Sequence, residues 1–126
     1  MYIKDLYAIS PQKTHDLSFE NGERLVLNEY IYKAIEPSYQ HLIPNAQLRR
    51  MGKAVRMGIG VSLPLLAKNP KPDGIIFGTA NGGLEDCIKF LNQIVEYNEG
   101  TLTPTNFVQS TPNALAGQVA LLSENQ

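Results

Sequence analysis

The chain has 126 residues, of which 43% are hydrophobic and 18% are charged, and its net charge is −1. These values fit one domain that is long enough to bury a core, and the near-neutral charge argues against a nucleic-acid partner, which would need a basic face. A single cysteine excludes an intramolecular disulfide, residues 1–10 lack a signal-peptide pattern, and no apolar run reaches the ~18–20 residues of a membrane span. We therefore expect a cytoplasmic protein without a membrane partner.

The first part of the chain predicts one strand followed by irregular structure. Residues 2–9 favour a β-strand, with Ile3 and Tyr7 among their strand-forming residues, and Pro11 closes it. Residues 11–47 show no regular periodicity and contain further helix-breaking prolines. We expect a surface excursion with short helical turns there.

Residues 48–67 carry the strongest helix pattern. Met51, Val55 and Ile59 recur at helical spacing. Each glycine in this stretch costs about 1 kcal/mol of helix propensity relative to alanine, which is tolerable where neighbouring segments approach closely. These glycines are Gly52, Gly58 and Gly60. The pattern predicts a buried helix that is kinked near its end by Pro64.

A short strand and an amphipathic helix are predicted next. Residues 74–78 (GIIFG) form an apolar run that fits a strand buried on both faces, and residues 81–83 form a glycine turn. Residues 84–97 then show helical periodicity. The face expected to be buried carries Leu84, Cys87, Ile88, Leu91, Ile94 and Val95. The face expected to be solvated carries Glu85, Asp86, Lys89, Gln93 and Glu96.

The C-terminal part predicts one more helix. Ser110 is expected as its N-cap and Pro112 in its first turn, and small residues fill its body over residues 113–122. The order strand, helix, strand, helix, helix indicates an α/β fold. In that plan the chain stops after a helix that should lead into another strand.

The glycine turn and the cysteine suggest two kinds of active site, and both have simpler explanations. GTANGG (78–83) has neither the GxGxxG spacing nor the Lys-Ser/Thr ending of a phosphate-binding loop. Cys87 lies near a helix start, but Glu85 and Asp86 beside it oppose a thiolate. Its place among apolar residues favours packing.

No other residue pattern indicates catalysis or metal binding. His15 and His41 stand in the irregular segment without a motif, and soft metal ligands are too few for a metal site. We therefore expect no catalytic residue, no metal and no cofactor. A small α/β enzyme that uses Cys87 stays open as the weakest alternative.

A basic cluster begins the 48–67 helix pattern, with Arg49, Arg50, Lys53 and Arg56. Such a cluster is most simply a solvated face. However, exposed cations at a helix N-terminus oppose the helix dipole at a cost of about 0.3–1 kcal/mol each. An acidic partner would relieve that cost, so the cluster is also a candidate docking surface.

Three ordered motifs resemble the N-terminal half of a β-ketoacyl-(acyl-carrier-protein) synthase, a condensing enzyme of the thiolase-like superfamily. They are LRRMGKAVRMGIG (48–60), IIFGTANGGLED (75–86) and NALAGQVA (113–120). The resemblance covers residues 48–122, with residues 1–10 as a further match. The 11–47 segment resembles a divergent branch of these synthases that is associated with pigment-like polyene pathways.

The resemblance implies a fold and a reaction. Residues 1–126 would form one domain, an incomplete N-terminal portion of a thiolase-like layered α/β fold. The full-length parent would perform decarboxylative Claisen condensation in fatty acid or polyketide biosynthesis. The family's nucleophilic cysteine and basic residues follow later in its pattern, so this chain alone is expected to be inactive. The alternative is a stand-alone, non-catalytic module that binds an acyl carrier protein or a ketosynthase partner.

The resemblance also implies roles for three residues. Arg49 and Arg50 match basic positions of the family's docking surface for the acidic acyl carrier protein. Thr111 falls where the family places a residue that lines the acyl pocket, close to the dimer partner. A homodimer is accordingly implied for the full-length parent.

Overall fold

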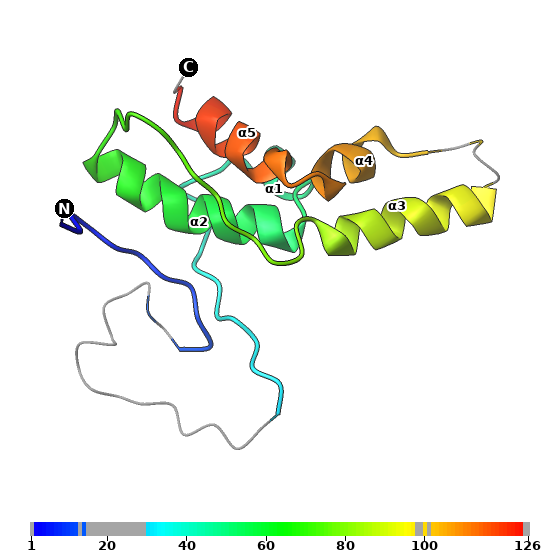
Figure 1. Ribbon diagram of the computed structural model, residues 1–126, viewed down its shortest axis with the longest axis horizontal. Coiled ribbons are helices and arrows are strands. Elements are labelled where there is room, and N and C mark those ends of the chain that lie inside the picture. The colour runs from blue at the N-terminus through cyan, green and yellow to red at the C-terminus, as the bar shows by residue number, and fades with distance from the viewer. Residues whose placement is uncertain (1, 13, 15–29, 98–99, 101, 125–126) are drawn as a thin grey trace.

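The computed structural model describes residues 2–12, 14, 30–97, 100 and 102–124. Within these residues it contains helices and no strand (Figure 1). The helices are α1 (Asn45–Leu48), α2 (Lys53–Lys68), α3 (Leu84–Tyr97), α4 (Pro104–Ser110) and α5 (Asn113–Leu122). None of these helices is both long enough and apolar enough to cross a membrane.

The core lies where α2 packs against α5. Ile59 of α2 and Val119 of α5 are completely buried, since the helical spacing of their apolar neighbours turns one face of each helix toward the other. A Cβ on Gly58 would overlap the side chain of Leu115 on α5. This close approach is the one that the glycine-rich sequence of α2 predicts.

A second pair of helices, α3 and α4, lies side by side and extends away from the core (Figure 1). The rings of Phe90 and Phe107 join them, with centroids 5.4 Å apart. Helix α4, which has seven residues, was not predicted from the sequence. Its signal is Pro104 at the first helical position, where a missing N–H costs nothing.

The expected strands over residues 2–9 and 74–78 are absent from the described residues, so the α/β prediction is not confirmed. A strand needs a hydrogen-bonded neighbour, and within the described part of the chain the 74–78 backbone has none. The described portion is helical and does not show the layered thiolase-like fold.

The helix expected over residues 48–67 corresponds to α2, which begins later than expected, whereas α1 is one of the short helical turns expected in the 11–47 segment. α1 ends at Leu48 and α2 begins at Lys53, because Gly52 between them is extended, with a ψ of 159°. α2 then continues through Pro64 to Lys68. The boundaries expected for α3 and α5 are confirmed. However, the N-cap of α5 is Pro112, whereas Ser110 ends α4.

The burial of several α3 side chains is the opposite of what we expected. Asp86, expected in solvent, is only 5% exposed, and its carboxylate lies against Gly52 at the start of α2. Large side chains that we expected to be buried are exposed instead: Leu84, Ile88, Leu91 and Val95. We refer to these four residues as the α3 stripe.

The segment before α1 contributes to the core, contrary to the expected surface excursion. Tyr39 is 7% exposed and Ile43 is 2% exposed, and a turn connects them through the Ile43 N–H, which donates to the Tyr39 carbonyl at 3.0 Å. A Cβ on Gly60 of α2 would lie 2.8 Å from the Tyr39 ring. Gly60 therefore leaves room for the segment to pack on α2.

Candidate functional site

Arg49 and Arg50, the expected docking residues, lie in the turn between α1 and α2. Arg49 is the C-cap of α1, where a cation complements the helix dipole, so the expected cost at a helix N-terminus does not apply to it. Both side chains are exposed, and neither has an ion pair within the described residues. They are therefore available to an acidic partner.

Arg56 of the same basic cluster has a different environment. Its Nε lies 3.4 Å from Glu36 Oε2, and the Tyr39 hydroxyl donates to the same oxygen at 2.7 Å. Burial opposes ionisation of Glu36, but the hydrogen bonds from Tyr39 and Arg56 outweigh it and hold the pKa of Glu36 below its ordinary value. Burial and the Glu36 carboxylate both raise the pKa of Tyr39. Arg56 thus holds the 30–43 segment on α2 and is not part of a free basic face.

A groove of about 430 Å³ begins at Arg50. Met51 and Val55 are buried at its floor, and side chains of α4 and α5 form its walls. Its volume falls in the ~300–1,000 Å³ range of ligand pockets, and its lining is mostly apolar. The arginine turn therefore combines exposed cations with an adjoining apolar groove.

Gln109 of α4 fixes the arginine turn in place. Its Oε1 accepts from the Gly52 N–H at 2.5 Å, and its Nε2 donates to the Arg50 carbonyl. Gly52 is the N-cap of α2 and has no side chain, and Gln109 supplies an acceptor for the N–H of Gly52 itself, one of the N–H groups that a helix start leaves without a partner. No local sequence pattern indicates this role, because Gln109 lies 57 residues from Gly52 in the chain.

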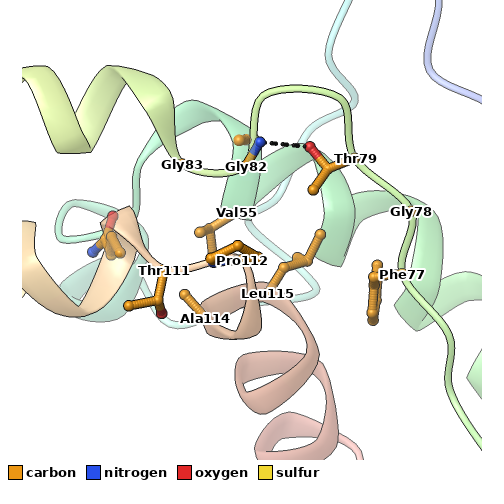
Figure 2. Close-up of a pocket in the computed structure, with 12 residues that line it drawn as sticks. Val55, Phe77, Gly78, Thr79, Gly82, Gly83, Thr111, Pro112, Ala114 and Leu115 are labelled. Carbon is orange, nitrogen blue, oxygen red and sulfur yellow. Dashed lines mark hydrogen bonds between the residues drawn. The ribbon is translucent and has the colours of Figure 1, made fainter.

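Thr111 lines a cavity on the other side of the α4–α5 junction, where Pro112, Leu115 and Phe77 also point (Figure 2). The Thr111 hydroxyl donates to the Val108 carbonyl at 2.8 Å. The cavity holds about 60 Å³, well below the ~300 Å³ at which ligand pockets begin. An acyl chain would fit only if this cavity widened, so the role of Thr111 stays a prediction.

The glycine turn borders the same cavity. Gly82 has a positive φ of 55°, a conformation that favours glycine, and its N–H donates to Thr79 Oγ1 at 2.9 Å (Figure 2). A Cβ on Gly83 would overlap the backbone of α4. These contacts give the turn a packing role, as its glycines predict.

The remaining candidates for chemistry are not gathered into a site. Cys87 is half-buried on α3, and its N–H donates to the Gly83 carbonyl at 2.8 Å. His41 is exposed in the turn after Tyr39, and His15 lies outside the described residues. Across the described ranges, no group of three or more His, Cys, Asp or Glu side chains could hold a metal ion.

Comparison with known families gives a match over most of the chain. The family model described as "Beta-ketoacyl synthase, N-terminal domain" matches residues 27–126. The match includes α1 to α5, the arginine turn and Thr111. Comparisons with curated proteins and with solved structures gave no match.

Proposed function

The chain belongs to the family of β-ketoacyl synthase N-terminal domains, and from this premise we propose that it forms the N-terminal part of a cytoplasmic 3-oxoacyl-(acyl-carrier-protein) synthase. The parent enzyme would serve fatty acid or polyketide biosynthesis. In its reaction the malonyl carboxylate leaves as CO₂ and the resulting carbanion forms a carbon–carbon bond to the acyl carbonyl. The thioester bond of the acyl group then breaks, and the thiolate that carried this group leaves. The reaction needs no external oxidant or reductant.

The contribution that we assign to this chain is docking of the acyl carrier protein. The observation that carries this assignment is the pair of exposed arginines, Arg49 and Arg50, without an acidic partner in the described residues and next to an apolar groove. An acidic carrier protein complements two adjacent guanidinium groups, and such complementarity steers association. Gln109 is hydrogen-bonded to the backbone of the turn that carries both arginines. The two cations therefore have a defined position.

We assign no catalytic residue to the chain and expect it to be inactive alone. Its single cysteine, Cys87, is half-buried among helix contacts, and the acids Glu85 and Asp86 precede it. A nucleophilic thiolate needs the opposite environment, with a nearby cation or base.

A second candidate is a stand-alone module that binds a ketosynthase without catalysis. The α3 stripe favours it, because an exposed apolar helix face marks an interaction surface. In this case a purified ketosynthase would bind the chain, and replacing Leu91 and Val95 with glutamine would weaken the complex. If the double variant binds the ketosynthase with unchanged affinity, this second candidate is excluded.

The docking assignment is tested by charge reversal. We expect Arg49→Glu combined with Arg50→Glu to weaken binding of an acyl carrier protein by about tenfold or more, measured by calorimetry at low salt. Added salt should weaken the wild-type complex, because it screens exposed charges.

The matched control compares Arg50→Glu with Lys71→Glu. Both replace an exposed cation by an anion, but Lys71 lies beyond the far end of α2, after roughly 24 Å of helix. Equal losses from the two single variants would reveal a general charge effect and would remove the arginine turn from the proposal.

A further inference from the structure

The groove beside Arg50 has an apolar interior that is open to solvent. Met51 and Val55 are buried at its floor. Val108 of α4 and Leu121 of α5 form its walls, and these two side chains are 53% and 72% exposed. Removing such apolar surface from water is favourable, at about 25 cal/mol per Å². A ligand that fits the groove therefore needs an apolar part.

The polar groups of the groove complement one negative charge. Arg50 is the one ionisable residue among the described residues that line it, and its guanidinium has no ion pair within the described part of the chain. The side-chain amides of Gln47 and Gln118 also line the groove, and they make no hydrogen bond within the same residues. A guanidinium binds a carboxylate through two parallel hydrogen bonds, and amide N–H groups can donate to its remaining lone pairs.

We propose that this groove binds a single-chain fatty acid as its carboxylate, with the head group at Arg50 and the hydrocarbon chain over Met51 and Val55. The volume of about 430 Å³ suits such a chain. A cavity of about 150 Å³ holds benzene, so the groove has room for roughly twelve carbon atoms or more. The cavity beside Thr111 is a different site, and at about 60 Å³ it is too small for this ligand.

The same ligand would regulate docking of the carrier protein. A carboxylate bound at Arg50 neutralises one of the two exposed cations of the arginine turn, so the fatty acid and the acidic carrier protein would compete. This consequence rests on the proposed function. Binding of the fatty acid itself depends only on the groove.

Calorimetry of the full chain with dodecanoate, below the concentration at which it forms micelles, tests the head-group contact. We expect Arg50→Gln to raise the dissociation constant about tenfold or more, because the carboxylate loses its charged partner. Arg49→Gln is the matched control, since Arg49 is the adjacent exposed cation but does not line the groove. It should leave the affinity unchanged, and equal losses in the two variants would overturn the proposal. Dodecyl phosphate should bind no more tightly than dodecanoate, because a single cation lines the groove. Tighter binding of the phosphate would contradict the choice of a carboxylate.

A second set of measurements tests the place of the hydrocarbon chain. Hexanoate should bind about tenfold more weakly than dodecanoate or worse, because it buries fewer CH₂ groups. Leu121→Gln should weaken dodecanoate binding about threefold or more, since it replaces an apolar wall of the groove. Val95→Gln is the control, as Val95 is an exposed apolar residue of the α3 stripe outside the groove. A loss confined to Val95→Gln would place the ligand on the α3 stripe and overturn the proposal.

Competition separates this proposal from carrier-protein docking. Saturating dodecanoate should raise the dissociation constant of the carrier protein. If the chain binds dodecanoate but no carrier protein, the groove assignment holds and the docking function is refuted. If it binds the carrier protein but not dodecanoate, the docking function holds and the groove assignment is refuted.

Discussion

At the scale of single residues, the α2–α5 contact depends on the missing side chain of Gly58. The Leu115 side chain occupies the space that a Cβ on Gly58 would fill. Glycine in a helix costs about 1 kcal/mol relative to alanine, so α2 is intrinsically weakened at this position. The close packing of Leu115 on α2 offsets that loss.

Gly58→Ala should therefore destabilise the fold. The added methyl group forces Leu115 to move, at a cost of about 1–3 kcal/mol that exceeds the gain in helix propensity. Gly117→Ala in α5 is the matched control, because a Cβ there would meet no atom within 4 Å. It should stabilise the protein by up to about 1 kcal/mol. Urea unfolding measures both, and a stabilising Gly58→Ala would show that Leu115 relocates freely.

At the scale of elements, Gln109 joins α4 to the start of α2. Gln109 bonds the backbone on both sides of Met51, at Arg50 and Gly52. A helix start leaves N–H groups without partners, and Gly52 cannot cap them with a side chain. The position of the arginine turn thus depends on a residue of a different helix.

Gln109→Leu should cost about 1–2 kcal/mol, because it leaves the Gly52 N–H and the Arg50 carbonyl without their partner. Gln118→Leu serves as control: Gln118 lines the same groove and has no hydrogen bond from its side chain in the described residues. Its effect should stay within about 0.5 kcal/mol. Thermal unfolding measures both changes. Equal losses would indicate that the groove, rather than the helix start, determines stability.

The same elements show how far the sequence predicts the fold. The bounds of α3 and α5 were predicted because their helical patterns are continuous and end at clear breakers. The late start of α2 was not predicted, since glycine is tolerated within helices and nothing local shows that residues 49–52 form a turn that ends in an extended Gly52. The prediction of a strand at residues 74–78 was not confirmed, for another reason. The apolar run predicted a strand buried on both faces, but Ile76 is 98% exposed, and strand formation depends on a neighbour that the pattern does not contain.

For the candidate site, the sequence predicted residue types better than their surroundings. The exposure of Arg49 and Arg50 follows from their charge, whereas the pairing of Arg56 with Glu36 joins segments 20 residues apart. The burial of Asp86 was likewise unforeseen. The Asp86 carboxylate lies against Gly52, which is distant in the chain, and beside Gln109 of α4, a helix whose seven residues carry too little periodicity to be recognised.

At the scale of the whole molecule, apolar side chains are distributed unusually. Among the described residues, six hydrophobic side chains are buried and fifteen large ones are exposed. A stable domain normally exposes such side chains singly, and a contiguous group marks an interaction surface. The α3 stripe is such a group, because its four residues follow one another along one helix face.

The α3 stripe should therefore bind an apolar fluorescent dye such as anilinonaphthalene sulfonate while the chain is folded. Leu91→Gln combined with Val95→Gln should reduce the dye fluorescence by roughly half, because it interrupts the stripe. Stability should change by less than about 1 kcal/mol, since both side chains are largely exposed. Tyr30→Gln combined with Ile31→Gln removes two exposed apolar side chains elsewhere and should have a smaller effect. Equal reductions by both pairs would mean that the dye reports scattered apolar residues, and would remove the evidence for a contiguous surface on α3.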